Sequence, residues 1–126
     1  MIAFDTNYLV RHIVQDDPAQ CRVVSSIIET ETAAERTIRI FDLVLLETAW
    51  VLQAVYAFDH EALWHVLNEI AEDSAFSFDD PIRLQSALAE YRRGKAEFAD
   101  CLISIAAKDE GLELKTFDKR LRKEIP

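Results

Sequence analysis

In Ile2-Ala3-Phe4-Asp5-Thr6-Asn7, at the start of the chain, a short apolar run is followed directly by polar residues. Such an apolar run is typical of a buried strand, and the polar residues after it suit the start of a helix. Apolar residues then recur at helical spacing, at Leu9, Val10, Ile13 and Val14. The stretch therefore predicts a buried strand that leads directly into a helix.

The pattern of a short strand followed by a helix recurs along the chain. Further strands are predicted over residues 37–41, 76–78 and 112–117. Further helices are predicted after Asp17, Asp59 and Asp80 and over residues 43–55 and 98–108. The helix over residues 43–55 is apolar on nearly every side, which indicates that it is buried in the core or in a subunit interface. Strands alternating with helices predict an α/β fold with a central, mostly parallel twisted sheet flanked by helices.

The length and composition describe one globular domain over residues 1–126. Half of the residues are hydrophobic and only five are Gly or Pro, which excludes disordered and collagen-like chains. Cys21 and Cys101 form no CxxC pair, which favours a reduced, cytoplasmic protein. No secretory leader is visible, and the nearly apolar stretch over residues 43–58 is short for a membrane span and carries Glu47. We therefore expect a soluble protein that does not enter a membrane.

The charge is strongly acidic and unevenly distributed. The net charge is −9, with −11 over residues 1–90 and +2 over residues 91–126. An acidic chain is a poor general binder of nucleic acid, because phosphates are neutralised by Lys and Arg. The candidates for holding an RNA backbone are therefore Arg92, Arg93, Lys95 and the basic run over residues 119–123, although a solvated basic face explains them equally well.

Four carboxylates stand in apolar segments or at the ends of predicted strands, namely Asp5, Glu47, Asp100 and Asp118. An unpaired carboxylate removed from water costs several kcal/mol, so four of them call for a compensating cation. Oxygen ligands of this kind suit Mg²⁺ or Mn²⁺. Asp5 and Asp118 would lie at strand carboxyl ends, where parallel sheets bind ligands, and Asp100 in the first turn of its helix.

Each of these acids also has an ordinary structural explanation. Asp5 could be a helix cap, Glu47 part of a salt bridge, Asp100 a first-turn acid and Asp118 a turn residue. Three neutral residues beside the acids could orient a carboxylate or a metal-bound water, and capping or β propensity explains them equally well. These residues are Thr6, Asn7 and Thr116.

Other catalytic signatures are missing from the sequence. The three histidines, His12, His60 and His65, share no metal-ligand spacing. With only Gly94 and Gly111, the chain has no glycine-rich phosphate loop and no nucleophile elbow. Nucleotide-binding loops of these types and serine-hydrolase chemistry are therefore excluded.

Four segments, in this order along the chain, resemble the PIN-domain nucleases and, within them, the VapC-type toxins of toxin–antitoxin pairs. They are Ile2-Ala3-Phe4-Asp5-Thr6-Asn7, Leu45-Leu46-Glu47-Thr48-Ala49-Trp50-Val51-Leu52, Glu97-Phe98-Ala99-Asp100-Cys101-Leu102-Ile103-Ser104 and Thr116-Phe117-Asp118-Lys119. The resemblance covers nearly the whole chain and implies a PIN-like domain over residues 1–126. It also implies an endoribonuclease that uses Mg²⁺ or Mn²⁺, is restrained by a cognate antitoxin protein and often acts as a homodimer.

The resemblance assigns roles position by position. The acidic residues of the family fall on Asp5, Glu47, Asp100 and Asp118, and its recurring polar neighbours fall on Asn7 and Thr116. Glu97 stands where many relatives carry Asp.

A mechanism follows from these residues. A metal ion held by Asp5 and Asp100 would polarise the scissile phosphate and lower the pKa of a bound water. Either Glu47 or Asp118 would orient or deprotonate that water. A catalytically inactive PIN-like interaction module is an alternative reading. A phosphoacceptor receiver domain fits less well, because Asp5 is single and Glu47 cannot replace an aspartyl acceptor.

Overall fold

The structure, a computed structural model, describes residues 1–118, so the predicted basic run over residues 119–123 lies outside the described residues. Three strands and six helices follow one another over this range. They are β1 (Ile2–Ala3), α1 (Thr6–Ile13), α2 (Pro18–Ala33), β2 (Ile38–Ile40), α3 (Asp42–Ala54), α4 (His60–Glu72), β3 (Phe76–Phe78), α5 (Pro81–Arg93) and α6 (Phe98–Asp109).

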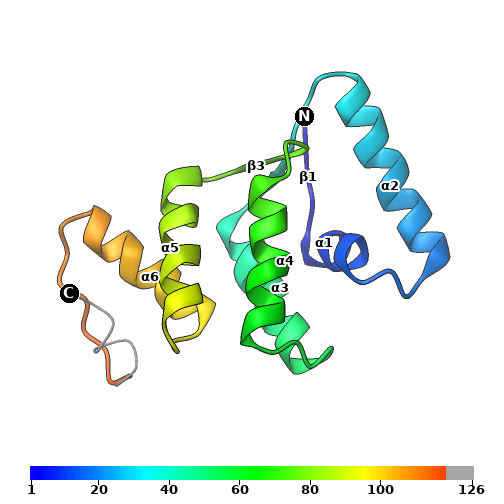
Figure 1. Cartoon of the computed structure of the whole chain (residues 1–126). Helices are drawn as coiled ribbons and strands as arrows, with labels where there is room; N and C mark the ends of the chain where they lie inside the picture. Colours follow the sequence, from blue (N-terminus) through cyan, green and yellow to red (C-terminus); the bar gives the residue numbers. More distant parts are fainter. Residues whose placement is uncertain (119–126) are drawn as a thin grey trace.

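The strands form a parallel sheet in the order β1-β2-β3, with Ile2 opposite Ile38 and Ile38 opposite Phe76. This arrangement confirms the predicted α/β fold. Figure 1 shows α1 and α2 at one end of the molecule, α3 and α4 in its middle and α5 and α6 at the other end. Since the strands are parallel, the residues that follow them leave the same edge of the sheet.

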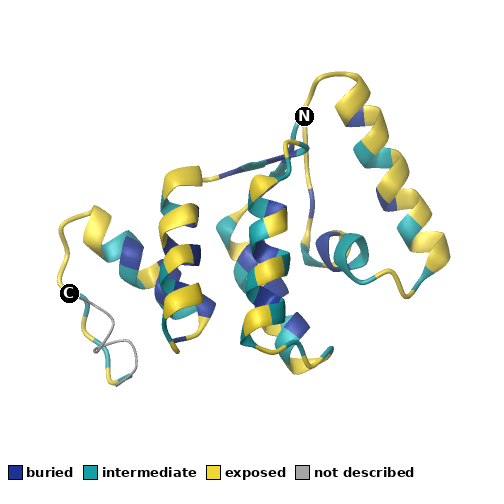
Figure 2. Cartoon of the chain, in the orientation of Figure 1, coloured by how far each residue is buried: buried dark blue, intermediate teal, exposed yellow. Residues whose placement is uncertain are grey.

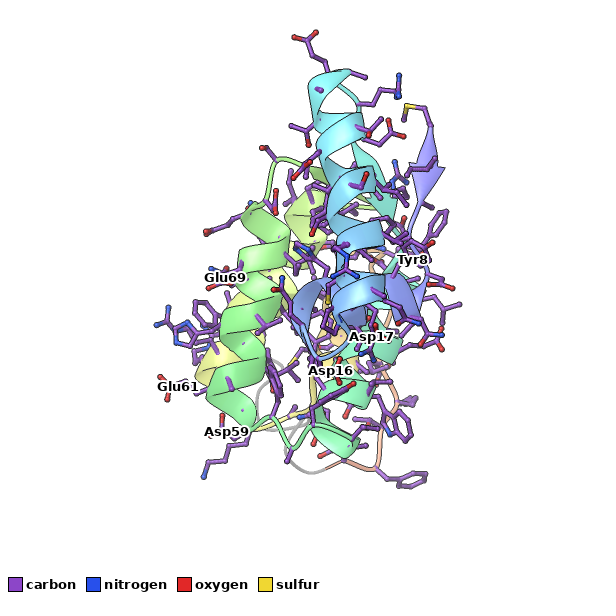
Figure 3. All side chains as sticks on the ribbon, turned by 90° about the vertical axis from the view of Figure 1, so that its right-hand side faces the viewer. Tyr8, Asp16, Asp17, Asp59, Glu61 and Glu69 are labelled. Atoms are coloured by element: carbon purple, nitrogen blue, oxygen red, sulfur yellow. The ribbon has the colours of Figure 1, made fainter. Side chains whose placement is uncertain are left out.

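Three helices begin where the sequence predicts, each at an aspartate that caps the backbone. The side chains of Asp17, Asp59 and Asp80 accept the N–H groups of Gln20, Ala62 and Arg83 at 3.1, 2.8 and 3.0 Å. Figure 3 shows Asp59 at the start of α4 and Asp17 by the start of α2. Capping of this kind satisfies N–H groups that have no partner inside the helix, so these starts are fixed by local chemistry.

The hydrophobic core lies between the sheet and the helices, and all six helices contribute buried residues to it, as the dark blue ribbon segments in Figure 2 show. On α5 the side chains of Leu84, Ala87, Leu88 and Tyr91 are buried. The predicted helix over residues 43–55 is buried on one side only: α3 buries Leu45 and Leu52 but exposes Leu43, Trp50 and the following Val55. Burial of one side leaves α3 with an apolar surface that faces solvent.

The strand predicted over residues 112–117 is wrong for the described structure. Gly111 ends α6 with a φ of +69°, the N–H of Leu112 donates to the carbonyl of Ala107, and residues 112–118 then continue without strand pairing. Leu112 is 62% and Phe117 97% exposed, so the alternating pattern buries little of its apolar surface. A strand needs a neighbouring edge, and Figure 1 places the end of the described chain beside α5 and α6, away from β1.

None of the helices described between residues 1 and 118 combines the length and the apolar character that crossing a bilayer requires.

Candidate functional site

Asp5 lies between β1 and α1 and caps the helix. Its Oδ1 accepts the N–H of Tyr8 at 2.9 Å, and the residue is exposed. The structure thus gives Asp5 the ordinary capping role that the sequence left open. A carboxylate has two oxygens with several lone pairs, so capping leaves Asp5 able to bind a cation as well. Its neighbours Thr6 and Asn7 are the first two residues of α1.

Glu47 lies in the middle of α3 and is exposed. The prediction that it is withdrawn from water is therefore wrong, because the apolar residues around it do not all face the core. Glu47 is four residues after Leu43 and three before Trp50, so these exposed side chains share one face of the helix. The next residue, Thr48, is fully buried, and its hydroxyl has no hydrogen-bond partner among residues 1–118.

Asp100 lies in the first turn of α6, where the helix dipole favours a negative charge. Together with Glu97 it borders a hollow of about 550 Å³ between α3 and the start of α6, called here the α3–α6 hollow. Its volume lies within the range of sites that bind small molecules. The hollow is lined by Leu46, Ala49, Trp50, Gln53, Ala54, Glu97, Phe98, Ala99 and Asp100.

The helix α3 connects the segments that carry three of the predicted acids. It packs against α1, which begins after Asp5, and against α6, which carries Asp100, and it carries Glu47 itself. Asp118 lies in the described segment that follows α6, residues 110–118, which forms no strand. The backbone N–H of Asp118 donates to the hydroxyl of Thr116 at 3.0 Å. Thr116 therefore bonds the backbone of the acid that it is predicted to assist.

The four acids supply only oxygen ligands, which is the chemistry that Mg²⁺ and Mn²⁺ prefer. Within residues 1–118, however, no three Asp, Glu, His or Cys side chains lie close enough together to hold a metal ion. The described part of the chain therefore offers suitable ligands without gathering a complete set, and it shows no metal site.

A further acidic group, formed by Asp42, Asp79 and Asp80, lies at the carboxyl edge of the sheet. Asp79 follows β3, and its Oδ2 accepts the N–H of Asp42, the first residue of α3, at 2.9 Å. Burial raises the pKa of Asp42, and the negative charges of Asp79 and Asp80 raise it further, against the opposing effect of Arg83. The signal in the sequence was that acids follow β2 and β3 as Asp5 follows β1.

Two of the histidines pack against aromatic rings. The ring of His12 lies edge-on to Phe76, with ring centroids 5.5 Å apart, and burial lowers the pKa of His12. The ring of His60 lies against Tyr91 with centroids 4.2 Å apart.

Comparison with known proteins identifies the family. The PIN domain family model matches residues 2–124. A VapC ribonuclease from Aquifex aeolicus (strain VF5) is 28% identical over 81 residues, which cover 64% of this chain and 60% of that protein. The chain thus matches about three-fifths of the length of that relative, and no solved structure matches. Because the family model spans nearly the whole sequence, this chain belongs to the PIN domain family.

Proposed function

We propose that the chain is an endoribonuclease that hydrolyses RNA phosphodiester bonds with Mg²⁺ or Mn²⁺. The observation that carries this proposal is the packing of α3 against both α1 and α6, which connects the helices associated with Asp5, Glu47 and Asp100. The match to a VapC ribonuclease adds support, since that relative is named for cleavage of RNA.

In this proposal the acids have two different roles. Asp5 and Asp100 are the metal ligands, and the bound cation supplies positive charge that offsets repulsion between the carboxylates and the scissile phosphate. Glu47 or Asp118 orients the attacking water and accepts its proton. The exposure of Glu47 on α3 suits contact with a solvent molecule. Asn7 and Thr116 assist as polar neighbours of Asp5 and Asp118.

Replacing Asp100 by Asn tests the proposal most directly. The change keeps the shape of the side chain but removes its charge, and we expect RNA cleavage to fall by at least about 100-fold. Asp109→Asn, at the exposed end of the same helix, is the matched control and should retain cleavage. Cleavage by the purified Asp100→Asn protein at the rate of the control would remove Asp100 from the site.

A catalytically inactive PIN module is the second candidate, favoured by the missing three-ligand cluster within residues 1–118. Titration with Mn²⁺ separates the two cases, because a ligand that binds only the native state raises thermal stability. An enzyme with a metal site should melt at a higher temperature with Mn²⁺, and Asp5→Asn should abolish the increase. Asn caps a helix about as well as Asp, so this variant should still fold.

We also propose that the chain is the toxin of a toxin–antitoxin pair in the cytoplasm. Growth arrest on expression, relieved by a small DNA-binding protein encoded by the neighbouring gene, would support this role. Growth that is unaffected by expression of an RNA-cleaving protein would argue against it.

We propose further that the chain forms a homodimer. The exposed apolar side chains Leu43, Trp50 and Val55 support this proposal. Leu43→Glu places an acid in the first turn of α3, where the helix dipole tolerates it, and light scattering should then show a monomer. A wild-type monomer would exclude the homodimer.

A further inference from the structure

A second hollow lies between α4 and α5, on residues that do not border the α3–α6 hollow. Its volume is about 330 Å³, and we call it the α4–α5 groove. The side chains that line it include an indole, two amides and two guanidinium groups, a combination suited to contacts with nucleic acid. They are Trp64, Asn68, Gln85, Leu88, Ala89, Arg92 and Arg93.

The centre of this groove is a stacked pair. The guanidinium carbon of Arg92 lies 4.0 Å from the ring centroid of Trp64. The indole is held in place by its Nε1–H, which donates to the carbonyl of Leu88 at 3.1 Å. A guanidinium that rests on an aromatic face uses none of its five N–H donors in that contact. The contact with Trp64 thereby fixes the position of Arg92 and leaves its N–H groups able to donate hydrogen bonds to a ligand.

Most other arginines in the described chain are paired with carboxylates. Arg93 pairs with Glu90, and Arg11, Arg36, Arg39 and Arg83 each pair with at least one Asp or Glu. Arg92 instead contacts the ring of Trp64, and among residues 1–118 it forms no ion pair with a carboxylate. Its charge is therefore not neutralised by a carboxylate of the described chain.

We propose that the α4–α5 groove binds the sugar–phosphate backbone of single-stranded RNA beside the bond that is cleaved. This inference rests on the proposed function. The planar donors of Arg92 match a phosphate, and the amides of Asn68 and Gln85 can bond phosphate or ribose oxygens. The acids Glu61 and Glu69 also lie on α4 (Figure 3), so the attraction is confined to the neighbourhood of Arg92 rather than spread along the helix.

The groove lies within reach of the proposed catalytic acids. Arg92 and Asp100 are eight residues apart in the chain, so their Cα atoms are separated by at most about 28 Å. The two hollows share no lining residue, so we expect a dinucleotide bound at the acids to leave the groove empty, whereas an RNA of several nucleotides can contact both. The proposal therefore predicts that the contribution of Arg92 depends on the length of the RNA.

The test measures binding rather than cleavage. Each variant is made in the Asp100→Asn protein, and its affinity is measured for a dinucleotide and for an oligoribonucleotide of about 12 nucleotides. Arg92→Ala should weaken binding of the longer RNA by at least about fivefold and reduce the salt slope by about 0.7, the value for one phosphate on a single strand. The loss for the dinucleotide should be smaller. Arg22→Ala, which removes an exposed arginine from α2, is the control of equal charge and should bind like the parent.

Four outcomes would overturn the inference. Equal affinities of the Arg92→Ala and Arg22→Ala proteins for the longer RNA would remove the groove from the RNA path. Equal losses for long and short RNA would mean that Arg92 acts at the acids. Tighter binding of an acidic peptide than of RNA, dependent on Arg92, would assign the groove to a protein partner. Circular dichroism shows whether Arg92→Ala is folded. If it is not, Arg92→Gln, which keeps a long polar side chain, replaces it in the test. Normal RNA binding by Arg92→Gln would also refute the proposal.

The two proposals can fail separately. A wild-type protein that cleaves RNA while Arg92→Ala binds normally refutes only the groove. A wild-type protein that binds RNA through Arg92 but does not cleave it refutes only the nuclease.

Discussion

The α3–α6 hollow and the α4–α5 groove carry side chains of opposite charge. The hollow is bordered by Glu97 and Asp100, and the groove by Arg92 and Arg93. These pairs are close in the sequence, because only a short loop separates the end of α5 from the start of α6. A chain with a net charge of −9 repels a polyanion. A local positive charge close to the acids in the sequence would therefore determine where RNA binds. The net charge of the chain therefore says little about the charge of one binding surface, because a short segment can carry the opposite sign.

The largest expected effect comes from removing the packing that holds the two regions together. Phe98 is fully buried at the start of α6, and its ring meets that of Tyr91 on α5 edge-on, with centroids 6.0 Å apart. Phe98→Ala should lower the free energy of unfolding by about 3–5 kcal/mol, because it creates a cavity in the core. Urea unfolding measures this change. A loss below about 1 kcal/mol would show that α6 packs less tightly than described.

A smaller effect is expected from removing the charge of one predicted catalytic acid. Glu47→Gln should reduce RNA cleavage by at least about 100-fold with little change in stability, because Glu47 is exposed. Glu29→Gln, an exposed acid on α2, is the matched control. If Glu47→Gln cleaves like this control, the role of orienting water passes to Asp118.

A change of Trp64, the ring on which Arg92 rests, should weaken RNA binding in the α4–α5 groove. Trp64→Phe keeps a ring but loses the hydrogen bond from Nε1 to Leu88, so we expect about 1 kcal/mol lower stability. The weaker ring should also reduce the affinity for long RNA by roughly twofold to fivefold. Fluorescence anisotropy of labelled RNA measures the second effect. A change in cleavage of the dinucleotide as large as the change in affinity for long RNA would mean that the two regions are not distinct.

The smallest effect concerns Asp42, at the edge of the sheet. A raised carboxyl pKa means that the folded protein holds the proton more tightly than the unfolded chain, whose ordinary value is 3.8. The contribution of this group to stability is therefore present at low pH and is lost as the pH rises from this value through the raised pKa of the folded protein. Asp42→Asn should stabilise the protein by less than about 1 kcal/mol at neutral pH, and the gain should vanish at acidic pH. Thermal unfolding as a function of pH provides the measurement, and a variant less stable at neutral pH would contradict it.

Local chemistry explains which predictions from sequence were confirmed. Helix starts at Asp17, Asp59 and Asp80 depend on a side chain that bonds an N–H three residues away, so a few residues suffice to specify them. The strands observed over residues 38–40 and 76–78 fall within those predicted over residues 37–41 and 76–78, where apolar residues alternate with polar ones. The order of the four segments that resemble PIN nucleases indicated the family, which the match over residues 2–124 confirmed.

Predictions that depend on distant contacts were less reliable. Residues 112–117 alternate like a strand, but alternation cannot supply the neighbouring edge that a strand must pair with. The apolar helix α3 gave no periodic signal of which side faces solvent, so the exposure of Glu47 was missed.

The helix starts, the alternation of strands and helices and the candidate acids can be predicted from the amino-acid sequence, because they depend on neighbouring residues. The contacts of α3 with both α1 and α6, and of Arg92 with Trp64, are seen only in the folded chain. Trp64 and Arg92 lie on different helices and meet only because α4 packs against α5. Packing of this kind is driven by burial of apolar surface across the whole core, and no local pattern records which surfaces will face one another.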